Sequence, residues 1–184
     1  MSGYFKAGLV IGRFQPFHKG HKFLVDSALD SCDTVVVVIG SAQLSDTPSN
    51  PLSWGERYNI ISNVYRDEIL NGRLHIVPIN DRTNYSNDSS FGEYIDAQIE
   101  NALGIHIDCV IEGKEDVRKD WYKSLPLKGT IQVDREGLDV SATKIREAIL
   151  NDDTDYLDAN GVEEAKIYYY RIKKVLKHYE EYKC

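Results

Sequence analysis

The most constraining feature of this sequence is a short apolar run near the N-terminus that turns through glycine and proline into a cation-rich segment. Residues 7–11 (Ala-Gly-Leu-Val-Ile) have the uninterrupted apolar pattern of a strand buried on both faces in a parallel sheet. Apolar residues then recur at helical spacing at Phe23, Leu24, Ala28 and Leu29. The sequence therefore predicts a strand, a loop and a helix in succession.

Glycines and cations are concentrated where this loop meets the helix. The residues concerned are Gly12, Arg13, Phe14, Gln15, His18, Gly20, His21 and Lys22. A helix N-terminus presents unpaired N–H groups and the positive end of the helix dipole, and both favour anions. Gly20 lets a polyanion approach the backbone, and His18 and His21 can donate to phosphate oxygens from one side. We predict a phosphate-binding site here.

Four further apolar runs predict the other strands, at residues 34–40, 74–78, 107–113 and 129–133. Helices are predicted from Ser53 to about Leu70, over 91–103, after Ser141 and over 162–182, and Ser53 with Glu56 forms a capping box. The predicted fold is α/β, a Rossmann-like open parallel sheet of about five strands with helices on both faces and a C-terminal helical tail. We expect one domain over residues 1–184, with the α/β core in 1–150 and C-terminal helices in 151–184.

Polar residues follow the strands at the edge where ligands bind in open α/β sheets. Ser41 and Gln43 follow the second predicted strand, and Gly113 ends the fourth. Ser141 is a natural N-cap, and Thr143 and Arg146 lie at the start of its helix, where they can grip a phosphate chain. These segments extend the predicted anion site.

Composition excludes some classes of function. The net charge of −7 argues against a polynucleotide partner, but not against a mononucleotide in a local cationic pocket. Cys32, Cys109 and Cys184 are odd in number and lack metal spacing, so we expect reduced thiols in a cytoplasmic protein. No signal sequence or run of about 20 apolar residues is present, so no membrane partner is expected. The tail helix, with tyrosines at 168–170, packs on the sheet or forms a subunit contact, and we expect a homo-oligomer.

Three separated motifs resemble one family. His18-x-Gly20-His21, after Gly-Arg-Phe-Gln-Pro-Phe, is similar to the HxGH signature of the nucleotidyltransferase α/β-phosphodiesterase superfamily. The longer string resembles its nicotinamide-mononucleotide adenylyltransferases of the short archaeal, bacterial and phage type. Residues 41–57 resemble the Ser-Ala-Gln and Asn-Pro-Phe-x-x-Gly-Glu-Arg elements of that family, and residues 140–146 its Ile-Ser-[Gly/Ser]-Thr-x-Ile-Arg motif, with Ala142 where glycine is common.

The resemblance implies that ATP and nicotinamide mononucleotide are joined to give NAD and pyrophosphate, by in-line attack of the mononucleotide phosphate on the α-phosphorus. It implies catalytic roles for His18, His21 and Arg146. It implies that ATP is bound by Gly12, Arg13, Phe14, Gln15, Gly20, Lys22, Gly113, Ser141 and Thr143. It implies that the mononucleotide is bound by Ser41, Gln43, Asn50, Trp54, Arg57, Tyr85 and Phe91. Mg²⁺ is expected to travel with the ATP phosphates, and no metal-binding residues are predicted.

Several alternatives stay open at this point. The family commonly stacks a loop tryptophan on the nicotinamide ring, whereas residues 80–90 contain none, so Tyr85 or Phe91 would replace it. A sister adenylyl- or cytidylyltransferase acting on phosphopantetheine, FMN or glycerol phosphate is the main alternative function, and a non-catalytic nucleotide sensor is another. Arg57 could instead pair with Glu56 or Asp67 on a solvated helix face. Zinc binding by His18 and His21 lacks a third ligand in sequence.

Overall fold

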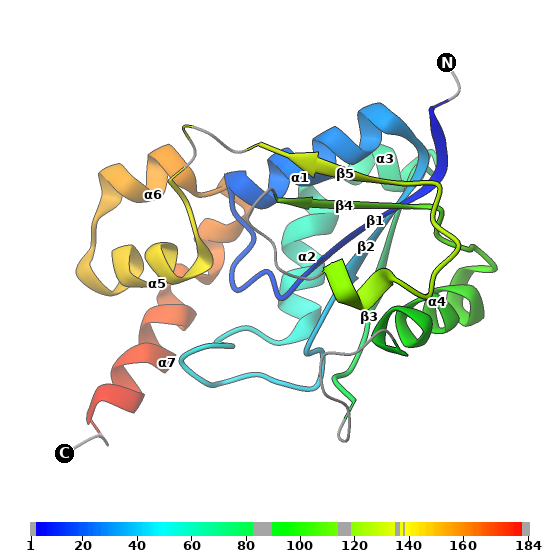
Figure 1. Cartoon of the computed structure of the whole chain (residues 1–184). Helices are drawn as coiled ribbons and strands as arrows, with labels where there is room; N and C mark the ends of the chain where they lie inside the picture. Colours follow the sequence, from blue (N-terminus) through cyan, green and yellow to red (C-terminus); the bar gives the residue numbers. More distant parts are fainter. Residues whose placement is uncertain (1–2, 83–89, 114–118, 135–136, 138, 182–184) are drawn as a thin grey trace.

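The core of the protein is a five-stranded parallel sheet in the order β3-β2-β1-β4-β5 (Figure 1). The computed structural model describes residues 3–82, 90–113, 119–134, 137 and 139–181. The strands are β1 (Phe5–Gly12), β2 (Cys32–Ile39), β3 (Leu74–Pro78), β4 (Cys109–Gly113) and β5 (Gly129–Val133). The predicted Rossmann-like fold is confirmed, and each strand that the sequence predicted is present with bounds shifted by at most two residues.

Helices cover both faces of the sheet, and two separate apolar clusters lie between the layers (Figure 1). The helical elements are α1 (Lys19–Ser31), α2 (Trp54–Val64), α3 (Arg66–Leu70), α4 (Ser90–Leu103), η1 (Lys119–Tyr122), α5 (Ala142–Asn151), α6 (Thr154–Asn160), η2 (Glu163–Tyr168) and α7 (Tyr169–Glu181). Side chains alternate along β2, so Val35 and Val37 join the cluster with α1, α2 and α5, while Val36 and Val38 join the cluster with α4. No helix among the described segments has the length and apolarity needed to traverse a bilayer.

The two central strands separate toward their carboxyl ends. β1 pairs with β2 along its whole length, from Phe5 to Gly12. With β4 it pairs at two positions, Gly8 with Cys109 and Leu9 with Val110, although both strands continue beyond these pairs. The strand order reverses between β1 and β4, and ligands bind at this switch point in open α/β sheets. The separation of β1 from β4 therefore opens the sheet at the place where a ligand is expected.

Two helix predictions were wrong in detail. The helix from Ser53 is interrupted at Tyr65 (φ −117°, ψ 36°), a buried tyrosine whose hydroxyl contacts Asp26 and the carbonyl of Lys22. The predicted helix over 162–182 is instead a 3₁₀ segment, η2, followed by α7. In a 3₁₀ segment, with three residues per turn, Ala165 packs inward while Ile167 is 74% exposed. The sequence pattern had placed Ile167 in the core, and the short helix α6 was not predicted.

The C-terminal elements hold the start of α1. His18 forms an isolated antiparallel bridge with Gly161, which follows α6. The ammonium group of Lys19 donates to the carbonyls of Asp158 (3.0 Å) and Ala159 (2.7 Å). The backbone at Gly161 leaves no room for a side chain, because a Cβ there would lie 2.4 Å from the Tyr169 hydroxyl. The tail thus fixes the backbone at the first turn of α1.

We expect Gly161→Ala to lower the free energy of unfolding by about 1–3 kcal/mol, since the added methyl group overpacks a closed contact. Gly55→Ala is the matched control, because a Cβ at this helical glycine meets nothing within 4 Å. The control should raise stability by about 0.5–1 kcal/mol through helix propensity. Urea denaturation of both variants measures the difference, and equal effects would contradict the proposed packing at Gly161.

Candidate functional site

Two stacked histidines lie at the N-terminus of α1. His18 is the N-cap residue, and its carbonyl accepts from the backbone N–H groups of His21 (2.9 Å) and Lys22 (3.0 Å). The imidazole centroids of His18 and His21 are 3.7 Å apart with an interplanar angle of 25°. His18 is 2% exposed, and His21 is half-buried. The helix start therefore offers two adjacent imidazoles together with the positive end of the α1 dipole.

Two buried phenylalanines fix the position of His21. The ring of Phe14 meets the His21 imidazole edge-on at 4.9 Å, and the ring of Phe17 lies 5.6 Å from it. Phe14 adopts a left-handed backbone (φ 52°), and its ring packs over the end of β1. A Cβ on Gly12 would lie 2.8 Å from the ring of Phe14, so the glycine leaves space for this ring. Phe14 is 1% exposed, so the structure places its side chain in the packing beneath the histidines.

Gly20 is required for a reason that differs from the sequence interpretation. A Cβ at this position would lie 2.9 Å from Val140 and 3.1–3.2 Å from the imidazole of His18. The absent side chain therefore lets α1 pack closely on the segment that leads to α5 and leaves space for the His18 ring. The approach of a polyanion to the backbone was the sequence-based explanation, and the close packing is what the structure shows.

Gln15 connects three of the predicted motifs. Its side-chain amide is 1% exposed and forms two hydrogen bonds with the backbone of Leu52, at 2.8 Å and 2.9 Å. Its carbonyl accepts from Nη1 of Arg146 at 2.8 Å. The Gln15 side chain is thus occupied by the segment before α2, and its backbone holds the arginine of α5 beside the histidine loop.

The third motif supplies a half-buried arginine. Ser141 caps α5 by accepting from the backbone N–H of Lys144 at 3.2 Å, and Arg146 donates to the Thr143 hydroxyl at 3.2 Å. Burial, and then the positive charge of Arg13, lower the pKa of Arg146 from its usual value. Arg13 is exposed, so it can turn toward a ligand. Two arginines that repel one another at a helix N-terminus favour the binding of an anion between them.

Arg57 lies beneath the site, and its place corrects both sequence interpretations of this residue. It is 0% exposed, so it is neither on a solvated helix face nor at a surface that a mononucleotide can reach. Its guanidinium donates to four backbone carbonyls, those of Ser53, Arg13, Gly40 and Ser41, at 2.8–3.2 Å. Burial, and then the charge of Arg13, lower its pKa to about 10. Arg57 fixes the backbone at the carboxyl ends of β1 and β2.

The Ser-Ala-Gln segment is held by an aspartate that the sequence analysis did not single out. Asp81 accepts from the Ser41 hydroxyl at 3.0 Å and from the Gln43 amide at 3.1 Å. The backbone N–H of Asp81 in turn donates to the Gln43 side chain at 3.0 Å. Ser41 and Gln43 therefore bind the segment after β3 and define the edge of the sheet there, while Ser41 has a left-handed backbone (φ 49°).

The other predicted ligand residues are scattered around this edge. Asn50 is 4% exposed, and no described residue donates to its Oδ1 atom, whereas Trp54 is 46% exposed beside Tyr58. Phe91 lies near the start of α4, and Tyr85 lies outside the described residues. Gly113 ends β4 as expected.

Lys22 points to a different partner from the expected phosphate. Its ammonium group pairs with Asp26 at 2.7 Å and lies 5.6 Å from the centroid of the Tyr65 ring. The hydrogen-bond donors that the described structure brings together at the loop are therefore the imidazoles of His18 and His21 and the guanidinium groups of Arg13 and Arg146.

The described side chains of this site include two arginines and two histidines. Within the described part of the chain, no group of three or more His, Cys, Asp or Glu side chains is arranged to hold a metal ion. Metal ions such as Mg²⁺ are usually held by carboxylates and phosphates. A divalent ion at this site would therefore be held mainly by the ligand.

The sequence analysis did not identify two residues near the site, one aromatic and one acidic. Trp121, in η1, packs edge-on against Phe91 with centroids 4.5 Å apart, so a tryptophan lies beside the start of α4 although the 80–90 loop has none. Glu112, one residue before the predicted Gly113, is 5% exposed. The sequence pattern of β4 could have identified Glu112, because this residue is the one charged side chain in a strand that is otherwise apolar before its final glycine. Nothing in the sequence connects Trp121 with Phe91.

A parallel sheet with a cationic helix N-terminus at its switch point defines a class of protein, namely an α/β protein that binds phosphate groups. The chain belongs to the cytidylyltransferase-like family, whose family model matches residues 9–148. The predicted membership of the nucleotidyltransferase superfamily is thereby confirmed.

Curated relatives carry the name nicotinamide-nucleotide adenylyltransferase. The chain is 45% identical over 76 residues to that of Thermoplasma acidophilum, a match that covers 41% of this chain and 42% of the relative. It is 40% identical over 75 residues to that of Saccharolobus solfataricus, covering 40% of this chain and 44% of the relative. The chain thus matches less than half the length of these relatives.

Solved structures show the same fold. A bifunctional NMN adenylyltransferase/ADP ribose pyrophosphatase from Francisella tularensis has a TM-score of 0.68 at 22% identity, over 97% of this chain and 55% of that chain. A structure from the same organism, complexed with AMP and a manganese ion, gives a TM-score of 0.65 at 21% identity, over 97% and 54%. This likeness supports the architecture of the sheet and its helices.

We expect Arg57→Met to lower the free energy of unfolding by at least about 3 kcal/mol, because each buried carbonyl left unpaired costs about 1–3 kcal/mol. Arg66→Met, at an exposed position of α3, is the control and should change stability by less than about 0.5 kcal/mol. Urea denaturation compares the two variants. Similar stabilities would mean that the carbonyls of the β1 and β2 ends do not depend on Arg57.

Proposed function

We propose that this protein is a nucleotidyltransferase that joins ATP and nicotinamide mononucleotide to form NAD and pyrophosphate. The observation that carries the proposal is the meeting of the stacked His18–His21 pair with Arg146 through the carbonyl of Gln15. These groups come from two segments that are far apart in sequence, and all of them can donate to phosphate oxygens. The chain's similarity to curated nicotinamide-nucleotide adenylyltransferases supports the choice of mononucleotide.

The proposed chemistry needs charge stabilisation rather than an activated nucleophile. A mononucleotide phosphate oxygen attacks the α-phosphorus of ATP, the bond from that phosphorus to the β-phosphate bridging oxygen breaks, and pyrophosphate leaves. Negative charge shifts onto the α-phosphoryl oxygens and the leaving pyrophosphate during this step. His18 would donate to the α-phosphate, His21 to the β- and γ-phosphates, and Arg146 with Thr143 would hold the rest of the triphosphate.

The protein groups would also determine where the divalent ion lies. The described residues at the anion site are cations and neutral donors, so Mg²⁺ would be bound by phosphate oxygens and water. When bound there, the ion would supply further neutralisation of the triphosphate charge. The cytoplasmic location and the homo-oligomeric state expected from the sequence stay predictions.

The test measures pyrophosphate release from Mg-ATP with nicotinamide mononucleotide, phosphopantetheine, FMN and glycerol phosphate as acceptors, with products identified by mass. We expect NAD from nicotinamide mononucleotide. His18→Ala and His21→Ala should each lower kcat by about 10²–10³, the usual effect of removing a donor to a transition state. His178→Ala, on the exposed side of α7, is the control and should retain full activity.

Two results would contradict the proposal in different ways. Pyrophosphate release with a different acceptor would retain the nucleotidyltransferase chemistry and overturn the assignment of the mononucleotide. ATP binding without pyrophosphate release for any acceptor would overturn the enzyme assignment and favour a nucleotide sensor. In that case His21→Ala would weaken ATP binding with no activity to lose.

A further inference from the structure

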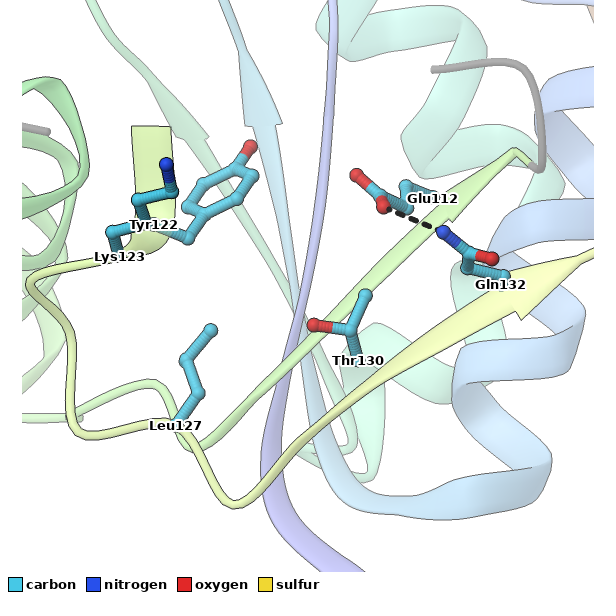
Figure 2. Close-up of a pocket in the computed structure, with 6 residues that line it drawn as sticks. All are labelled: Glu112, Tyr122, Lys123, Leu127, Thr130 and Gln132. Carbon is cyan, nitrogen blue, oxygen red and sulfur yellow. Dashed lines mark hydrogen bonds between the residues drawn. The ribbon is translucent and has the colours of Figure 1, made fainter. Parts of the chain in front are cut away.

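A cavity of about 470 Å³ lies against β4 and β5, on the face of the sheet that packs against α4 (Figure 2). Its lining residues come from β4, β5, η1 and the segment between η1 and β5: Glu112, Tyr122, Lys123, Leu127, Thr130 and Gln132. A cavity of this size is in the range of small-molecule sites, which measure about 300–1,000 Å³. No residue of the proposed phosphate site lines it.

Glu112 is a buried acidic residue in the lining of this cavity. The same face of the sheet carries Leu9, Val36, Val38 and Val110, so a carboxylate interrupts an apolar surface. Glu112 is 5% exposed, and its Oε1 atom accepts one long hydrogen bond, 3.4 Å, from the Gln132 amide. Its Oε2 atom has no hydrogen-bond partner among the residues that the structure describes. A buried carboxylate that has lost water requires donors or a cation in return.

The position of Glu112 links this cavity to the substrate site. The pairing of β1 with β4 ends at Leu9 and Val110, and Glu112 lies two residues further along β4, where the sheet has opened. Tyr122 lines the cavity, and its neighbour Trp121 packs against Phe91, one of the two aromatics expected to stack on the mononucleotide base. Glu112 therefore lies near the switch point of the sheet, and η1 connects the cavity lining with Phe91.

Nicotinamide mononucleotide and nicotinate mononucleotide differ in the charge of the group attached to the pyridinium ring. The ring of nicotinamide mononucleotide is a pyridinium cation that carries an uncharged carboxamide with two N–H donors. The ring of nicotinate mononucleotide carries a carboxylate in the same position, which has no donor and repels another carboxylate. A buried carboxylate whose Oε2 atom accepts no hydrogen bond from the described residues is complementary to the first form and opposes the second.

We propose that Glu112 is a specificity-determining residue, which accepts from the carboxamide of the nicotinamide ring and rejects the nicotinate form of the mononucleotide. This inference rests on the proposed function and names its substrate preference. Among the described residues that line the cavity, Lys123 is the one cation, and it is exposed, whereas Glu112 is buried. Charge interactions are stronger away from water, so Glu112 outweighs Lys123 in the selection.

The experiment compares kcat/KM for nicotinamide and nicotinate mononucleotides in the wild-type protein and in Glu112→Gln. We expect the wild type to favour the amide by at least about 10-fold, and the variant to lower that ratio by about 10- to 100-fold, because it keeps an acceptor for the carboxamide but loses the charge that repels the nicotinate carboxylate. The change should arise in KM, and most of it from improved use of the nicotinate form. Glu93→Gln, an exposed carboxylate on α4, is the matched control and should leave the ratio unchanged.

A second variant tests the effect of charge near the cavity on substrate preference, without changing Glu112. Lys123→Gln should raise the preference for the amide by about threefold or less, because it removes an exposed cation near the cavity. An unchanged ratio in Glu112→Gln, or a wild type that favours nicotinate mononucleotide, would overturn the inference while leaving adenylyl transfer intact.

A wild type that turns over neither mononucleotide would instead contradict the proposed function. Isothermal titration calorimetry of the two mononucleotides would then decide the inference through their ratio of Kd values. Tighter binding of the amide that is lost in Glu112→Gln supports the assignment, and equal binding of both forms overturns it.

Discussion

The buried guanidinium of Arg57 is the interaction on which the rest of the site depends. Its bonds to the carbonyls of Arg13, Gly40 and Ser41 join the loops that leave β1 and β2, and its bond to Ser53 joins these loops to the start of α2. Carbonyls at strand ends have lost their sheet partners and need donors when they are buried. A single side chain with several donors in a planar fork satisfies them together. The loop that follows β1 leads directly to the proposed phosphate-binding residues, so their positions depend on an arginine that is itself fully buried.

Much of the fold could be predicted because the strands are uniform apolar runs. The predicted strands, the capping box at Ser53 and the N-cap at Ser141 all rest on local patterns, and all are present. The tail could not be predicted as well, since a 3₁₀ segment and an α-helix have similar apolar spacing over a few residues. Which of them forms depends on contacts such as that of Gly161 with His18, which join distant parts of the chain.

The site was predictable where chemistry and motif coincide, and less so where residues support one another. The catalytic roles expected for His18, His21 and Arg146 stay predictions, and the structure brings the loop and the arginine together through Gln15. The packing of Phe14 and Gly20 and the burial of Arg57 were not predicted, because a motif shows that a residue type is required without showing which neighbour requires it. Glu112 and Trp121 acquire their significance from the opening between β1 and β4 and from the packing of η1 on α4, which no local pattern encodes.

The bridge between His18 and Gly161 also has a consequence for how the protein is made. A ribosome that has released residues 1–150 has delivered every phosphate-binding segment, yet the backbone that clamps His18 is still unsynthesised. The nascent sheet can form at that stage, since its strands are complete by Val133. The bridge to His18 can form only after α6 and Gly161 have been synthesised. The backbone geometry at the start of α1 thus depends on polypeptide that lies beyond the sheet in the chain.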